Sequence, residues 1–190
     1  MIAFFEVVVK LHVFFENIPA DTNSKLQSVP NPSVERACIF IYISTLNCMS
    51  AKHFQFSFES SKQPGEIFQY LINPQNWWMG LFGEEIKGEN KKPGDEFTFK
   101  AGDGVHYSKQ KMLELIPDKK IVWLVTESKL SFLQNESEWT GTRFGFDIGQ
   151  QNGKSKITFS HFGLTNEIEC FDQCSSAWMQ YMHKLKTKMQ

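Results

Sequence analysis

The chain has 190 residues, a formal net charge of −1, 41% hydrophobic residues and 22% charged residues. These proportions are ordinary for a globular protein and fit one large domain, or one domain with an extension. The near-neutral charge excludes a strongly basic nucleic-acid surface, because neutralising phosphates needs clustered Lys and Arg. The 18 Phe and 5 Trp are ample for a large core or an apolar cavity.

The first 48 residues differ from the rest, because all 12 Gly and all 5 Trp lie after residue 48. Their two apolar runs, 1–10 and 37–46, fall short of the roughly 18 residues that a membrane-spanning helix needs, and neither is typical of a secretion signal. We expect residues 1–48 to be an extension outside the fold, with Met49 as the natural start, and 49–190 to be the domain. The four Cys lack a CxxC spacing, which favours a reducing, cytoplasmic compartment.

The first elements after Met49 are a strand and a helix. Phe alternates with polar residues from 54 to 59, which predicts a half-buried strand. Pro64 stands where a helix tolerates proline best, in its first turn, and Asn73-Pro74 ends that helix. Residues 75–79 are expected to form a second short helix or turn.

Turn residues then separate a series of strands. The expected strands span residues 84–87, 96–100, 105–116, 120–127, 139–148 and 154–164. Gly102-Asp103-Gly104 is expected to be a hairpin turn, since it lacks the Lys and the following helix of a phosphate-binding loop. With the first strand, this pattern predicts an antiparallel sheet of about seven strands.

The last segment predicts a long helix that begins after a cap at Thr165 or Asn166 and ends near Lys188. Its apolar residues recur at gaps of three and four, at Ile168, Phe171, Cys174, Trp178, Met182, Leu185 and Met189. Such a stripe needs an apolar surface of similar length, which the sheet can supply. We therefore predict an α+β fold in which a curved antiparallel sheet wraps around the C-terminal helix, with two short helices after the first strand.

A series of different short motifs occurs along the chain in a characteristic order. They are Glu66-Ile-Phe68 with Leu71 and Pro74, Trp78, Gly94-Asp-Glu-Phe97, Glu114-Leu-Ile-Pro117, Ile121-Val-Trp123, Trp139-Thr-Gly-Thr142 with Phe144, Ile157-Thr-Phe-Ser-His161, Gly163-Leu164, Cys170 and Trp178. Their order and spacing resemble the START-like (SRPBCC, birch-pollen-allergen-like) helix-grip superfamily, over residues 50 to about 188. Within it, the chain is similar to the branch named for the activator of the heat-shock protein 90 ATPase. The resemblance implies one of three roles. The protein binds a hydrophobic ligand, it acts as a cyclase or as the partner of a hydroxylase, or it assists the chaperone.

In this fold, the space between sheet and helix is either a filled core or a ligand cavity. The residues expected to line a cavity are Trp78, Phe99, Tyr107, Trp123, Phe144, Phe159, His161, Trp178 and Met182. For any one of them, plain core packing is the alternative.

His161 is the polar member of that set, on the strand face that carries Ile157 and Phe159. It either orients a polar ligand group or acts as an acid or base, or else it is a core histidine satisfied by a carbonyl or hydroxyl. No nucleophile has a base at a suitable spacing, so no catalytic residue is assigned. Cys170 and Cys174 lack further ligands at metal-binding spacing, and no metal site is expected.

We therefore expect a non-enzymatic protein that holds a small hydrophobic or amphipathic ligand, without a cofactor, a nucleic-acid partner or a membrane partner. Two alternatives remain open. One is an interaction module with a filled core that modulates a chaperone or similar ATPase through its surface. The other is a cyclase- or hydrolase-type enzyme that uses His161 with a nearby acid.

Overall fold

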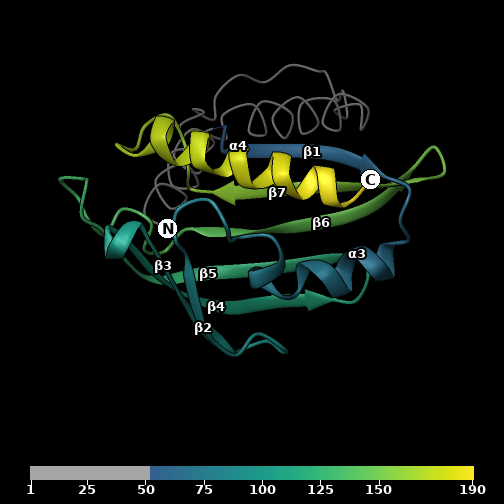
Figure 1. Ribbon diagram of the computed structural model, residues 1–190, viewed down its shortest axis with the longest axis horizontal. Helices are drawn as coiled ribbons and strands as arrows, with labels where there is room; N and C mark the ends of the chain where they lie inside the picture. Colours follow the sequence, from purple (N-terminus) through teal and green to yellow (C-terminus); the bar gives the residue numbers. More distant parts are fainter. Residues whose placement is uncertain (1–51) are drawn as a thin grey trace, which may run out of the picture. The chain divides into compact units, whose positions relative to one another are not determined.

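The computed structural model of the chain describes residues 52–190 (Figure 1). The predicted extension 1–48 and the start at Met49 lie outside the described residues and stay predictions. The elements in chain order are β1 (Phe54–Ser60), α3 (Pro64–Leu71), the 3-10 turn η2 (Pro74–Asn76), β2 (Glu85–Gly88), β3 (Glu96–Ala101), the 3-10 turn η3 (Gly102–Gly104), β4 (His106–Ile116), β5 (Lys120–Leu130), β6 (Arg143–Gln151), β7 (Lys154–Phe162) and α4 (Phe171–Lys188).

The seven strands form one sheet in the order β1-β7-β6-β5-β4-β3-β2, and every neighbouring pair is antiparallel. The first strand pairs with the last, so β1 and β2 are the two edges of the sheet formed by residues 52–190. Figure 1 shows α3 and α4 on the same side of this sheet. The predicted helix-grip architecture is confirmed, with α3 and η2 as the two short helical segments after β1. Between residues 52 and 190, no helix is both long and apolar enough to cross a membrane.

Local signals explain why α3 and η2 form where they do. Pro64 occupies the first turn of α3, and the Gln63 amide donates to Glu66 Oε2 at 3.2 Å, which satisfies an N-terminal N–H. The side chain of Asn73 accepts the Gln75 amide at 3.1 Å and starts η2. Asn73-Pro74 therefore ends one helix and begins the next turn, as the sequence indicates.

The core lies between the inner face of the sheet and α4. Its largest fully buried side chains are Trp78, Trp123, Trp178, Phe97, Phe99, Phe144, Phe146 and Phe159. Helix α4 contributes most of its predicted stripe, with Cys174, Met182 and Leu185 buried beside Trp178. Each large apolar side chain removed from water contributes about 1.5–3 kcal/mol, so this aromatic layer is the main force that holds helix to sheet.

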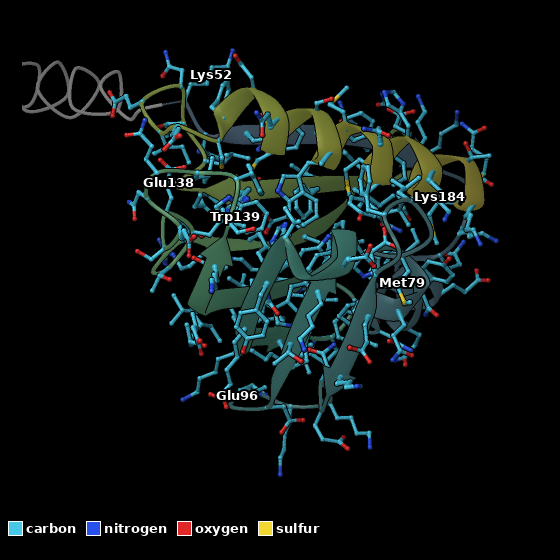
Figure 2. The ribbon with its side chains drawn as sticks, turned by 60° about the vertical axis from the view of Figure 1, so that its left-hand side comes forward. Lys52, Met79, Glu96, Glu138, Trp139 and Lys184 are labelled. Atoms are coloured by element: carbon cyan, nitrogen blue, oxygen red, sulfur yellow. The ribbon has the colours of Figure 1, made fainter. Side chains whose placement is uncertain are left out.

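Helix α4 begins later than the sequence predicts, at Phe171 instead of just after Thr165 or Asn166. The carboxylate of Glu138, in the segment before β6, accepts the amides of Glu169 at 2.6 Å and Cys170 at 2.9 Å. Figure 2 shows Glu138 near this end of α4. A side chain distant in sequence therefore anchors the entry of the helix.

The strand boundaries around that segment also differ from the prediction. Strand β6 begins at Arg143, because Trp139 turns inward before it and is only 3% exposed. Strand β5 continues to Leu130, because it stays paired with β4 as far as His106, beyond a register shift between Lys109 and Gln110. The segment from 131 to 142 is therefore a connection that folds over one end of the sheet.

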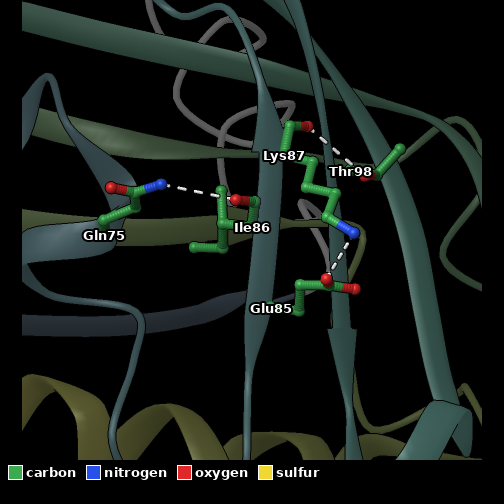
Figure 3. A network of polar contacts seen from close by, with 5 residues as sticks. All are labelled: Gln75, Glu85, Ile86, Lys87 and Thr98. Atoms are coloured by element: carbon green, nitrogen blue, oxygen red, sulfur yellow. Dashed lines mark hydrogen bonds and ion pairs between the residues drawn. The ribbon is translucent and has the colours of Figure 1, made fainter.

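Edge strand β2 is short and is secured by polar contacts (Figure 3). Gln75 Nε2 donates to the Ile86 carbonyl at 3.3 Å, and Thr98 Oγ1 donates to the Lys87 carbonyl at 3.3 Å. Lys87 also forms an ion pair with Glu85. A short, charged edge strand limits pairing with other chains.

Candidate ligand pocket

A pocket of about 270 Å³ lies between the first half of α4 and the end of the sheet where β3 meets β4. Four segments far apart in sequence build it: the loop before β2, the β3–β4 connection, the connection before β6, and α4. The residues that line it are Trp78, Phe82, Phe99, Ala101, Gly102, Val105, His106, Phe132, Trp139, Gln173, Cys174, Ala177, Trp178 and Tyr181.

The wall of the pocket is mainly aromatic. Phe99 stacks on Trp78 with ring centroids 4.0 Å apart, and Trp178 lies 5.0 Å from Trp78. Trp139 is nearly parallel to Trp178, with centroids 5.9 Å apart and an angle of 8° between the rings. Among residues 52–190, no Asp, Glu, Lys or Arg belongs to the lining. Such a surface can hold an apolar ring, and it offers no partner to a charged group.

The mouth of the pocket carries exposed apolar side chains. Phe82, Val105 and Phe132 are 42%, 45% and 40% exposed, respectively. The Gly102 amide donates to the Phe82 carbonyl at 2.8 Å, which fixes the loop before β2 against η3. Large apolar side chains gathered at an opening are typical of a surface that contacts a ligand or a partner.

Glu84 holds the loop that bears Phe82. Its carboxylate accepts the amides of Gly80 at 2.6 Å, Leu81 at 2.9 Å and Phe82 at 3.0 Å. It also accepts the Tyr181 hydroxyl of α4 at 2.5 Å. Burial by itself raises the pKa of Glu84, but the hydrogen bonds from Tyr181 and the backbone outweigh it and lower the pKa to about 2. The ionised carboxylate thus ties the loop to α4.

A second contact from α4 holds the loop before β2. Lys184 Nζ donates to the Met79 carbonyl at 2.7 Å, and Figure 2 shows the two residues together beside α4. Glu84 and Lys184 together position Trp78 and Phe82 in the pocket wall.

His161 lies behind the pocket wall, not in it. Trp178 Nε1 donates to His161 Nδ1 at 2.9 Å, and His161 Nε2 lies 3.0 Å from Thr142 Oγ1. Because the Thr142 hydroxyl donates to the Trp139 carbonyl at 2.6 Å, its oxygen accepts the Nε2 proton. Burial is the main reason that the pKa of His161 falls to about 3. The ring is neutral, both nitrogens are engaged, and its action in this structure is to hold Trp178 in place.

The structure divides the nine predicted site residues into three groups. Trp78, Phe99 and Trp178 line the pocket. Buried in the core away from the lining are Trp123, Phe144, Phe159, His161 and Met182. Tyr107 pairs with Lys100 on the other face of the sheet, while its neighbours His106 and Ser108 point inward.

Sequence reasoning missed most of the pocket rim. Phe82 and Phe132 lie in loops, where no periodicity marks an inward side chain. Val105 lies in the turn before β4, although the sequence predicts a strand that begins there. Tyr181 could have been found, because it lies three residues after Trp178 and seven after Cys174 on the helical stripe. The sequence predicts a strand over 139–148, and a strand position gives no reason to place Trp139 against α4, whereas β6 begins only at Arg143.

Cys170 and Cys174 are small buried side chains at the start of α4. Trp139 Nε1 donates to Cys170 Sγ at 3.1 Å, which orients the indole in the pocket wall. Contact with Cys170, followed by burial, raises the pKa of the Cys174 thiol, so the thiol stays protonated. Across residues 52–190, no three His, Cys, Asp or Glu side chains come together as they would to hold a metal ion.

Together, the strand order, the closing helix and the position of the pocket define a helix-grip protein of the START-like class. Residues 62–190 match the family described as Activator of Hsp90 ATPase homolog 1-like protein, and the chain belongs to this family. Both levels of the resemblance drawn from the sequence are therefore confirmed. No curated protein matches the chain.

Solved structures share the fold at low sequence identity. The solution structure of the Aha1 dimer from Colwellia psychrerythraea is 19% identical, with a TM-score of 0.56, over 73% of this chain and 96% of that one. The AHSA1 protein from Silicibacter pomeroyi is 12% identical, with a TM-score of 0.54, over 72% and 96%. A major latex-like protein from Panax ginseng is 10% identical, with a TM-score of 0.53, over 74% and 98%. At these identities the likeness shows the fold alone.

Proposed function

We propose that the domain binds a small apolar molecule in the pocket between α4 and the β3–β4 end of the sheet, and performs no chemistry on it. The observation that carries this proposal is the aromatic, uncharged wall that faces an opening. Three polar groups in or behind the wall support a passive role, because His161 has both nitrogens engaged, the Cys174 thiol stays protonated, and burial lowers the pKa of His106 to about 4.

The pocket wall is well ordered for binding. Trp178 is fixed through His161, and Trp139 is fixed through Cys170. A rigid wall loses little side-chain entropy when a ligand enters, so more of the gain from burying apolar surface, about 25 cal/mol per Å², becomes affinity.

A substitution that fills the pocket tests this function. Ala177→Leu adds bulk at the lining, whereas Ser176→Leu adds a similar group on the exposed side of the same helix turn. With naphthalene as the probe in titration calorimetry, we expect Ala177→Leu to weaken binding about tenfold or more, and Ser176→Leu to leave it unchanged. Equal binding by both variants, or no binding to the unsubstituted protein, would contradict the proposal.

A second candidate function is modulation of a chaperone ATPase, which the family description suggests. The exposed apolar rim of Phe82, Val105 and Phe132 favours it as a contact surface. In that case, Phe132→Ser should reduce the effect of the protein on ATP turnover by heat-shock protein 90 from the same cell. Leu113→Ser, which changes another exposed apolar residue outside the rim, should not.

We also propose a cytoplasmic location. The four Cys of the sequence show no CxxC spacing and no regular pattern, which supports a reducing compartment.

A further inference from the structure

We propose that the pocket selects an uncharged ring compound with a hydrogen-bond acceptor, such as a carbonyl oxygen, that meets the imidazole of His106. The inference rests on the proposed function and names the chemical class of the ligand. Three steps support it: the polar groups of the lining, the orientation of His106, and the charge of the wall.

Besides its three Trp residues, the lining contains four polar side chains, those of His106, Gln173, Cys174 and Tyr181. The indole N–H groups of Trp139 and Trp178 are engaged with Cys170 and His161. The Tyr181 hydroxyl donates to Glu84. The Cys174 thiol stays protonated, because contact with Cys170 and burial raise its pKa, and a thiol is a weak donor. Gln173 is exposed at the start of α4. His106 is the polar ring that the sheet contributes to the lining.

The neighbours of His106 decide which nitrogen carries its proton. Gln110 Nε2 donates to Ser108 Oγ at 2.6 Å, and both residues are fully buried. Ser108 Oγ lies 3.5 Å from His106 Nε2, and we infer that the hydroxyl donates to this nitrogen because its oxygen already accepts the Gln110 amide. A neutral imidazole with an accepting Nε2 carries its proton on Nδ1. His106 Nδ1 forms no hydrogen bond with any residue from 52 to 190, so its N–H is available to a ligand.

Aromatic neighbours fix the ring in that position. His106 packs edge-on against Trp139, with centroids 4.8 Å apart and an angle of 89°. It meets Phe99 in the same way at 5.1 Å and 69°. A ligand ring that lies along Trp139 or Phe99 therefore has a donor beside its own edge.

The charge of the wall excludes an acid as the preferred ligand. The lining has no Lys or Arg to pair with a carboxylate. His106 does not replace them, because burial lowers its pKa to about 4 and the ring is neutral at pH 7. A carboxylate would lose its hydration without gaining an ionic partner, whereas a ketone loses far less.

Three rigid probes of nearly the same shape test the inference by titration calorimetry of the full chain at pH 7.5. They are naphthalene, 2-acetylnaphthalene and 2-naphthoate. We expect 2-acetylnaphthalene to bind about five- to tenfold more tightly than naphthalene, as one hydrogen bond predicts. We expect 2-naphthoate to bind at least about tenfold more weakly than 2-acetylnaphthalene.

The His106→Phe variant keeps a ring in the wall and removes the donor. In this variant, naphthalene and 2-acetylnaphthalene should bind equally. An unchanged preference for the ketone would overturn the role of His106, and 2-naphthoate binding as tightly as the ketone would overturn the selection for uncharged ligands. The comparison of the three probes on the unsubstituted protein needs no variant. Failure of naphthalene itself to bind would instead refute the proposed function.

Discussion

Buried polar side chains that do not line the pocket nevertheless determine its shape. Both ring nitrogens of His161 form hydrogen bonds, one with Trp178 and one with Thr142. The Glu84 carboxylate accepts hydrogen bonds from three backbone amides and one hydroxyl. Each such hydrogen bond contributes about 1 kcal/mol net, but a buried partner left without one costs about 1–3 kcal/mol. The aromatic wall therefore depends on groups that a ligand never touches.

The neutral state of His161 predicts a pH dependence of stability. An unfolded histidine has a pKa near 6.5, whereas burial lowers the folded-state pKa to about 3. Between these values the unfolded chain binds more protons, so stability is complete above pH 6.5 and declines as the pH falls toward 3. From pH 8 to pH 5 this ring should cost about 2 kcal/mol of unfolding free energy, measured by urea unfolding. His161→Gln should flatten the pH dependence by that amount, and an unchanged slope would contradict the assignment.

Gly145 shows how closely strands β5 and β6 approach each other. A Cβ at this position would lie 2.1 Å from the Ile121 carbonyl oxygen and 3.0 Å from Val122 Cα, both of which are backbone atoms. Gly145→Ala should therefore lower the unfolding free energy by about 2 kcal/mol or more in urea titrations. Gly149→Ala on the same strand meets nothing within 4 Å and serves as the control. Similar losses in both variants would argue against the close approach.

Helix α4 and the loop before β2 form the side of the pocket that is secured by polar contacts. The start of the helix is held by Glu138, and farther along Tyr181 and Lys184 reach back to the loop. The loop has little regular structure of its own, so these contacts set its order.

Loss of the Glu84 carboxylate should therefore release the loop. In Glu84→Ala, the amides of Gly80, Leu81 and Phe82 lose their acceptor, and their hydrogen exchange should accelerate about tenfold or more. Glu85→Ala removes the neighbouring exposed carboxylate and should leave these amides protected. If the exchange of the three amides is the same in both variants, Glu84 does not hold the loop.

The sequence predicts the types of helix and strand well, because their periodicities are strong. The prediction from sequence fails where contacts with side chains distant in sequence determine the end of an element or the direction of a side chain. The start of α4 depends on Glu138, which no local capping pattern can reveal. The inward face of β4 carries Ser108 and Gln110, so the alternation that would have shown Tyr107 to point outward is masked by buried polar residues. The rim lies in loops, where the fold alone gives each side chain its direction.

The domain combines a filled core with a pocket at one end. Helix α4 and the segment after α3 share the inner face of the sheet. Phe144 and Phe159 pack against Trp178 of α4, whereas Trp123 packs against Trp77. Near η3, the loop before β2 and the connection before β6 complete the wall between sheet and helix, and there the pocket opens. The same helix therefore faces a filled core along part of its length and a cavity near its beginning.

Native mass spectrometry of the full chain, purified gently from its own kind of cell, tests the central claim that the pocket holds a small apolar molecule. We predict an added small-molecule mass that is lost on denaturation, that is present in Ser176→Leu and that is absent from Ala177→Leu. A bare protein mass for the unsubstituted chain, or an adduct retained by Ala177→Leu, would contradict the claim.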